Sequence, residues 1–136
     1  MLILYADGGC FPNPGNATYG VVAVRHGREC YSVSRSIGHG TNNIAEWRGA
    51  IAALTYALYQ PDTLIELRLD SQVVVEQFNG RYRVKKRELQ PLANEAKQIA
   101  REIEARGARL TVSWVAREHN ARADALARKR ATRHAA

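Results

Sequence analysis

The sequence of 136 residues lacks the features of disulfide-rich, repetitive and membrane-embedded proteins. Its two cysteines, Cys10 and Cys30, are too few for a disulfide scaffold and fit a reducing, cytoplasmic setting. No apolar run approaches the roughly 18 residues of a membrane-spanning helix, and no basic segment leads into a long apolar stretch at the start. We therefore expect neither a membrane span nor a secretory signal. Without repeats or low-complexity linkers, we expect one domain over residues 1–136, with a flexible tail over about 131–136.

Several motifs of common enzyme classes are also missing. There is no Gly-x-x-x-x-Gly-Lys-Ser/Thr phosphate loop, no Gly-x-Gly-x-x-Gly dinucleotide motif and no Gly-x-Ser-x-Gly nucleophile elbow. The two cysteines lie 20 residues apart without a second cysteine or histidine at ligand spacing, which argues against zinc.

Positive charge is abundant and unevenly placed. The net charge is +7, which favours a polyanionic partner, although a basic surface can also serve solubility alone. Residues 1–80 hold 5 Lys and Arg against 7 Asp and Glu, whereas residues 81–136 hold 15 against 6. An enzyme acting on nucleic acid can use both halves, with cations for phosphates and carboxylates for metal ions.

The hydrophobic pattern predicts an α/β protein in the order β-β-β-α-β-α-α-β-α. The expected strands cover residues 2–6, 19–24, 30–37, 64–69 and 110–115. The expected helices cover residues 44–58, 71–78, 89–103 and 121–130. Three consecutive antiparallel strands followed by helix-linked strands make a mixed sheet with helices on its faces.

Four acidic residues lie at the ends of these expected elements: Asp7, Glu46, Asp70 and Asp124. Each position also has a simpler structural explanation. Asp7 with the glycines at 8 and 9 can form a turn, and Glu46 can complete a capping box with Asn43. Asp70 can cap a helix, and Asp124 can favour a helix N-terminus. Their joint occurrence at ends that can converge on one sheet edge is harder to explain structurally.

Converging carboxylates require a counter-charge. Two carboxylates about 4 Å apart repel by roughly 4 kcal/mol at an effective dielectric near 20. Oxygen-only ligands select hard ions such as Mg²⁺ or Mn²⁺, and two such ions about 3.5–4 Å apart serve in-line phosphodiester cleavage. A metal-dependent nuclease accounts for both the acids and the basic half.

Four ordered motifs resemble type 1 ribonuclease H over nearly the whole chain. They comprise residues 4–10 with 13–15, residues 41–46, residues 69–72, and residues 117–120 with 123–127. The resemblance implies a ribonuclease H-like fold, with a five-stranded mixed sheet of three antiparallel and then parallel strands. It implies endonucleolytic hydrolysis of the RNA strand of RNA–DNA hybrids, which leaves 5′-phosphate and 3′-hydroxyl ends, with two Mg²⁺ or Mn²⁺ ions.

The resemblance also implies roles for individual residues. Asp7, Glu46, Asp70 and Asp124 match the family's catalytic and metal-binding carboxylates. Asp7 and Asp70 are expected to share the ions, Glu46 to hold one ion and touch the RNA 2′-hydroxyl, and Asp124 to hold the ion on the nucleophile side. The implied substrate-binding residues are Asn13, Thr41, Asn42, Asn43 and Gln72. Amides suit 2′-hydroxyls in a shallow groove because they both donate and accept, while turn and helix-cap roles are the alternatives.

The sequence departs from the family pattern in two places. Many members carry a basic helix, the handle, where this chain has only a short basic run, whose cations are Arg81, Arg83, Lys85, Lys86 and Arg87. That run can clamp a hybrid or form a solvated loop. The family's mobile-loop histidine has an uncertain counterpart, for which His119 and Arg117 are both candidates.

Two other classes of function stay open at this point. One is a related DNA nuclease or resolvase, against which the amides around Asp7 and Glu46 argue. The other is a catalytically silent nucleic-acid-binding module, although a binder of polyanions gains nothing from clustered acids. We expect an RNA–DNA hybrid as the partner, a monomer without an obligate protein partner, and no membrane association.

Overall fold

The computed structural model describes the backbone of residues 1–135 and the side chains of residues 1–128. Its strands are β1 (Leu2–Phe11), β2 (Gly15–Arg25), β3 (Arg28–Gly40), β4 (Leu64–Leu69) and β5 (Arg109–Trp114). Its helices are α1 (Asn42–Leu58), α2 (Gln72–Phe78), α3 (Gln90–Ala105) and α4 (Ala121–Ala135), with a 3-10 turn, η1 (Arg117–His119), before α4. The predicted order of elements is confirmed. In the described part of the chain, no helix has both the length and the apolar character that crossing a bilayer requires.

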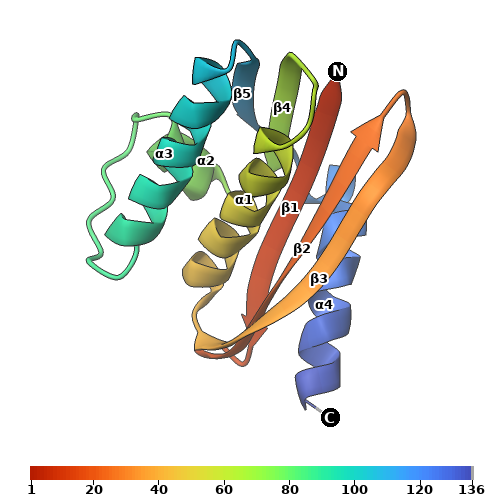
Figure 1. Ribbon diagram of the computed structural model, residues 1–136. Coiled ribbons are helices and arrows are strands. Elements are labelled where there is room, and N and C mark those ends of the chain that lie inside the picture. Colours follow the sequence, from red (N-terminus) through yellow and green to blue (C-terminus); the bar gives the residue numbers. More distant parts are fainter. Residues whose placement is uncertain (136) are drawn as a thin grey trace.

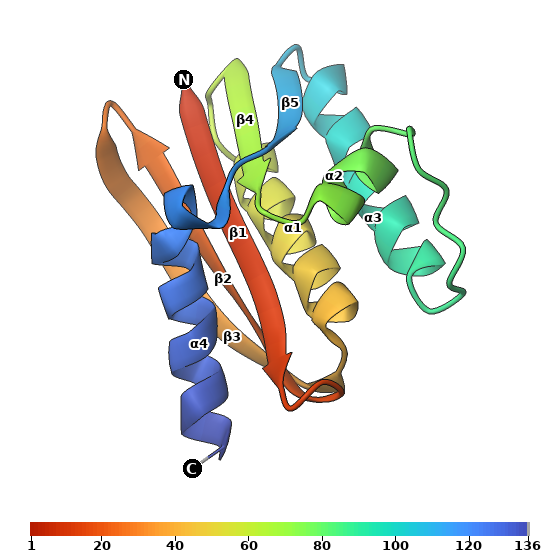
Figure 2. The ribbon, with the colours of Figure 1, turned by 180° about the vertical axis from the view of Figure 1, so that it is seen from behind.

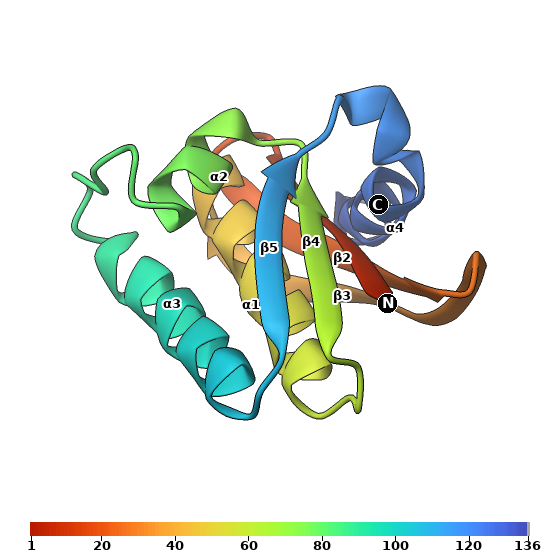
Figure 3. The same ribbon diagram turned by 90° about the horizontal axis from the view of Figure 1, so that it is seen from above.

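The five strands form one mixed sheet in the order β3-β2-β1-β4-β5. The first three strands are antiparallel neighbours, and β4 and β5 run parallel to β1. This arrangement confirms the predicted fold class. Helices α1 and α3 lie on one face of the sheet, and α4 lies alone across β1 and β2 on the other (Figures 1 and 2). Figure 3 shows the layers from above.

The core lies between α1 and the middle of the sheet. Trp47 and Leu54 of α1 are fully buried, as are Leu2 and Leu4 of β1. The apolar stripe of α1 thus packs on the face of β1 that carries Leu2 and Leu4, because alternate residues of a strand point to the same face. Burial of several large apolar side chains, each contributing about 1.5–3 kcal/mol, fixes α1 across β1.

The predicted turn at Asp7 is wrong, because β1 continues to Phe11. The two glycines that suggested a turn lie inside the strand. A Cβ atom at Gly8 would lie 2.3 Å from the carbonyl carbon of Ala45, so glycine lets β1 approach the backbone of α1. The hairpin strands β2 and β3 are likewise longer than predicted.

Close backbone approach also seats α4. A Cβ atom at Gly20 of β2 would lie 2.5 Å from the carbonyl oxygen of Ala123. The hydroxyl of Thr18 donates to the Ala127 carbonyl at 2.6 Å, and that of Ser34 to the Leu126 carbonyl at 2.6 Å. The backbone is helical to Ala135. The expected flexible tail over about 131–136 stays a prediction, because residue 136 and the side chains from 129 onward lie outside the described residues.

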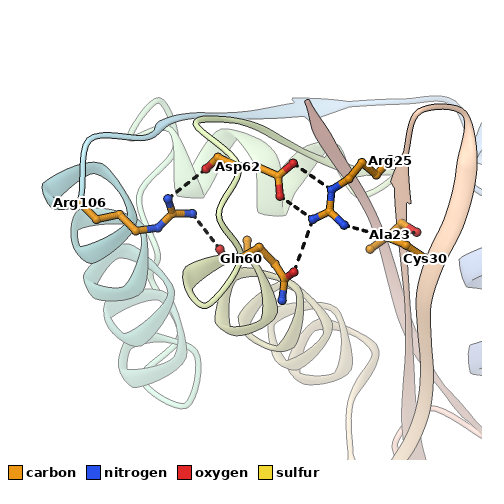
Figure 4. A network of polar contacts seen from close by, with 7 residues as sticks. Ala23, Arg25, Cys30, Gln60, Asp62 and Arg106 are labelled. Atoms are coloured by element: carbon orange, nitrogen blue, oxygen red, sulfur yellow. Dashed lines mark hydrogen bonds and ion pairs between the residues drawn. The ribbon is translucent and has the colours of Figure 1, made fainter.

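A polar network joins the end of α1 to the β2–β3 hairpin (Figure 4). Arg25 of β2 donates to Asp62 at 3.1 and 2.5 Å and to Gln60 at 3.4 Å. Arg106, just after α3, donates to the carbonyl oxygens of Asp62 and Ala57 at 3.0 and 3.1 Å. The loop between α1 and β4 is therefore tied to the β2–β3 hairpin by Arg25 and to the end of α3 by Arg106.

Candidate active site

Three carboxylates from distant parts of the chain meet at one edge of the sheet. Asp7 lies on β1, Glu46 on α1, and Asp70 directly after β4. One carboxylate oxygen from each lies within 4.8 Å of the other two. The parallel register of β1 and β4 pairs Ala6 with Leu69, so the residues that follow them, Asp7 and Asp70, come together.

The fourth predicted acid, Asp124, lines the same pocket but lies outside this cluster of three. The pocket has a volume of about 350 Å³, and all four carboxylates contribute to its wall. Arg128, one helical turn further along α4, donates to Asp124 at 2.8 Å. The structure thus gathers the four acids in one cavity and gives Asp124 a cationic neighbour.

The simpler explanations for two of these acids are wrong. The N-cap of α1 is Thr41, whose hydroxyl accepts from the Ile44 N–H at 3.2 Å, so Glu46 completes no capping box. The N-cap of α2 is Ser71, which leaves the Asp70 side chain free of that role. Neither carboxylate caps the N-terminus of a helix.

Burial makes this cluster electrostatically unfavourable without a counter-ion. Burial, and then the charge of Asp70, raises the pKa of Asp7 to about 7. Burial and the nearby Asp7 carboxylate raise the pKa of Glu46 well above its ordinary value. Glu46 Oε2 and Asp70 Oδ2 are buried and accept no hydrogen bond from the described residues. Carboxylate oxygens that receive no hydrogen bond suit a hard divalent cation.

The two candidates for the accessory position occupy different places. Arg117 lines the acidic pocket, and its Nε atom lies 3.9 Å from Asp70 Oδ2. His119 is exposed and lines a separate small cavity with Tyr5 and Arg122. Arg117 is therefore the candidate that stands beside the carboxylates.

Two of the four predicted amide residues line the pocket. Asn42 and Asn43 line it. The side-chain oxygen of Asn42 accepts from the Cys10 N–H at 2.9 Å, and that of Asn13 accepts from the Asn42 N–H at 3.2 Å. Gln72 is exposed at the start of α2 and does not line the pocket.

The basic run forms a loop between α2 and α3, and no helix replaces the missing handle among these described residues. Gln77 and Gln90 donate to the carbonyl oxygens of Arg83 and Val84, which fixes the loop backbone. Arg81 pairs with Glu76 at 2.6 Å. The other four cations, Arg83, Lys85, Lys86 and Arg87, are exposed and form no ion pair with the described side chains.

Sequence reasoning missed three side chains at this site. Arg128 pairs with Asp124, and its spacing of four residues from Asp124 on a helix is a usable sequence signal. Buried Asn120 donates to the Ala6 carbonyl at 2.9 Å and so ties the start of α4 to β1. Trp114 is half-exposed and donates to the Asp70 carbonyl at 3.2 Å. The last two contacts join distant segments and have no local sequence signature.

Comparison with protein families gives a match over most of the chain. A family described as "Reverse transcriptase-like" matches residues 5–130. A "Ribonuclease H" from Phenylobacterium zucineum is 34% identical over 143 aligned positions, which cover 94% of this chain and 88% of the relative. The "Bifunctional protein Rv2228c" of Mycobacterium tuberculosis is 38% identical over 128 residues, covering 93% of this chain. The chain spans only about a third (34%) of that relative's length.

Solved structures share the fold over nearly their full length. The N-terminal RNase H domain of Rv2228c from M. tuberculosis superposes with a TM-score of 0.88 at 37% identity, covering 99% of this chain and 98% of that one. The LC11-RNase H1 in complex with an RNA/DNA hybrid gives a TM-score of 0.79 at 36% identity, covering 93% of each chain.

Proposed function

Because this chain belongs to the ribonuclease H family, we propose that it hydrolyses the RNA strand of RNA–DNA hybrids with divalent metal ions held in its acidic pocket. The observation that carries the proposal is the cluster of Asp7, Glu46 and Asp70, whose oxygens lie within 4.8 Å of one another. A related enzyme, LC11-RNase H1, has been solved with an RNA/DNA hybrid, which supports the choice of substrate.

The donor set fits Mg²⁺ or Mn²⁺. Asp7, Glu46 and Asp70 would hold the ions, and Asp124 would complete the set from α4. Glu46 Oε2 and Asp70 Oδ2, which accept no hydrogen bond from the described residues, are ligand atoms that such ions could bind. When bound, a pair of these ions supplies the Lewis acidity for in-line displacement at phosphorus.

The proposed reaction adds water at phosphorus and breaks the bond to the 3′ oxygen. It leaves a 5′-phosphate on one RNA fragment and a 3′-hydroxyl on the other. Arg117 stands at the pocket wall beside Asp70, where a guanidinium can bind a phosphate oxygen. We therefore assign the accessory role to Arg117 rather than to His119.

Recognition of RNA would use the amides beside the pocket. The carbonyl oxygen of the Asn42 side chain is already engaged by Cys10, which leaves its NH₂ group free to donate within the described part of the chain. Asn13 and Asn43 flank it, and Thr41 and Gln72 lie at the starts of the two neighbouring helices. The amides can contact 2′-hydroxyls and thereby distinguish RNA from DNA, whereas Thr41 would help to hold a phosphate of the DNA strand.

The basic loop would bind the hybrid backbone in place of the handle. Four of its cations are exposed and form no ion pair with the described side chains, and the loop backbone is anchored by Gln77 and Gln90. An anchored loop loses less conformational entropy on binding than a free one, so it can act as a clamp.

The proposal is tested by cleavage of an end-labelled hybrid, with duplex DNA and duplex RNA as parallel substrates. We expect cleavage of the RNA strand of the hybrid in Mg²⁺ or Mn²⁺ and none in EDTA. Cleavage of duplex DNA would indicate the related DNA nuclease. Binding of the hybrid without cleavage in either metal would indicate a silent binding module.

A further inference from the structure

An open groove lies on the face of the sheet opposite α4, between α1 and the edge strand β3. It has a volume of about 610 Å³, larger than the acidic pocket. In Figure 1 no helix lies in front of the outer part of β2 and β3. From Arg48 to Tyr59 the wall formed by α1 is about 16 Å long, at 1.5 Å per residue. None of the predicted catalytic or substrate-binding residues lines this groove.

The groove concentrates the tyrosines of the protein. Four of the chain's six tyrosines line it: Tyr19, Tyr31, Tyr56 and Tyr59. Tyr59 is 79% exposed, and the other three are half-buried. Flat aromatic rings on an accessible surface are the side chains on which unpaired bases stack. We name this surface the tyrosine groove.

Its shape is fixed before any ligand binds. The rings of Tyr31 and Tyr56 stack with centroids 4.1 Å apart and planes 12° apart, which joins β3 to α1 across the floor. At one end, the Arg25–Asp62 pair and the Gln60 contact hold the hairpin against the end of α1 (Figure 4). A preformed groove loses little conformational entropy when a ligand enters.

Two cations stand on its walls, Arg35 from β3 and Arg48 from α1. Both are exposed, and neither forms an ion pair with the described side chains. Glu95 is the one acidic residue among those that line the groove. The groove therefore carries net positive charge beside its aromatic rings. This combination suits a nucleic acid strand, whose phosphates can pair with the arginines while its bases stack on the rings.

We propose that the tyrosine groove binds single-stranded DNA, with bases stacking on Tyr59 and phosphates pairing with Arg35 and Arg48. A paired duplex hides its base faces, so the rings favour an unpaired strand. The choice of DNA over RNA rests on the proposed function, because hydrolysis of the RNA strand leaves the DNA strand unpaired. No residue lines both the groove and the acidic pocket, so this strand would not occupy the acidic pocket.

The test is fluorescence anisotropy of a labelled oligo(dT) of about ten nucleotides, measured in EDTA so that no cleavage occurs. The variant R35Q/R48Q is compared with R101Q/R109Q, which removes the same charge from exposed positions outside the groove. We expect R35Q/R48Q to weaken binding at least tenfold and to lower the slope of log K against log salt by about 1.4, or 0.7 per lost phosphate contact. The control should change affinity less than threefold.

The stacking contact is tested separately at Tyr59, which is too exposed for its loss to unfold the protein. Tyr59→Ala should weaken oligo(dT) binding about tenfold without changing the salt slope, and Tyr59→Phe should restore the affinity. Equal losses in R35Q/R48Q and R101Q/R109Q would overturn the site, as would wild-type affinity in Tyr59→Ala. Oligo(U) binding as tightly as oligo(dT), or an oligoglutamate peptide displacing it, would overturn the DNA assignment.

The same variants separate this proposal from the proposed function. R35Q/R48Q should cleave a blunt-ended hybrid at the wild-type rate, because neither arginine lines the acidic pocket. An active enzyme that binds oligo(dT) equally well with and without the groove cations would disprove the groove alone. A protein that binds oligo(dT) in the groove but cleaves no hybrid would disprove the catalytic proposal alone.

Discussion

Gly8 of β1 lies against the backbone of Ala45 in α1, so closely that a Cβ atom there would stand 2.3 Å from the Ala45 carbonyl carbon. This contact places Glu46, the next residue of α1, beside Asp7, the residue before Gly8. The spacing of the acidic cluster therefore depends on a residue without a side chain.

Substitution of Gly8 by alanine should push α1 away from β1. We expect the free energy of unfolding to fall by about 2–3 kcal/mol, as for other overpacked cores. Cleavage should also be lost, because Glu46 moves away from Asp7. Gly9→Ala is the matched control, since its Cβ atom would meet Asn42 Oδ1 at an ordinary 3.6 Å. Denaturant titration of both variants measures the difference, and equal stabilities would contradict the role of Gly8.

The acidic cluster should make the metal-free protein less stable as the pH rises. Folding raises the pKa of Asp7 from 3.8 to about 7, so the folded state binds its proton more tightly than the unfolded state does. This contribution to folding is neutral below about pH 4, and it becomes increasingly unfavourable up to about pH 7. In EDTA at pH 8, Asp7→Asn should therefore be more stable than the wild type by on the order of 2 kcal/mol.

Urea titrations from pH 4 to pH 8 test this effect. The two proteins should differ least near pH 4, where Asp7 is protonated in the folded state and about half protonated in the unfolded state. Addition of Mg²⁺ at pH 8 should narrow the gap, because the ion stabilises the wild-type carboxylates. A constant difference between the two proteins across the whole range would show that Asp7 is not the group responsible.

The accessory position can be assigned by a pair of substitutions. Arg117→Ala should lower kcat about tenfold or more, because the guanidinium lies at the pocket wall 3.9 Å from Asp70 Oδ2. His119→Ala should leave kcat within about twofold, since this side chain lines another cavity. Steady-state cleavage of the hybrid separates the two, and the reverse pattern would return the role to His119.

The basic loop should contribute to substrate binding and not to chemistry. Simultaneous substitution of Lys85, Lys86 and Arg87 by glutamine should raise KM, leave kcat near the wild-type value, and flatten the salt dependence of KM. R101Q/R109Q again provides the charge-matched control. If the triple variant keeps the wild-type salt slope, the loop does not contact phosphates.

The sequence was most informative where its signals were periodic or belonged to a motif. The apolar stripe over residues 44–58 and the short apolar run over residues 2–6 correctly predicted α1 and the first part of β1. The glycines at 8 and 9 led to the wrong prediction of a turn, because glycine serves both turns and close backbone packing. Only the position of the α1 backbone against Gly8 distinguishes the two roles.

Long-range contacts limited what could be predicted at the site. The hydrogen bond from Asn120 to Ala6 spans 114 positions, and the capping roles of Thr41 and Ser71 became clear only with the helix boundaries. The four acids were named from motifs, but their spacing depends on how β1, β4 and α1 pack. The packing of β2, β3, α1 and α3 likewise forms the tyrosine groove, whose residues are scattered from position 19 to position 95.

The central claim is that these carboxylates hold the divalent ions that cleave the hybrid. The most direct measurement compares the wild type with Asp70→Asn, which removes one ligand and keeps the volume of the side chain. Cleavage of the hybrid in Mg²⁺ or Mn²⁺ should fall by roughly a thousandfold, while hybrid binding in EDTA and the fold stay unchanged. Cleavage by Asp70→Asn within about tenfold of the wild type would contradict the account.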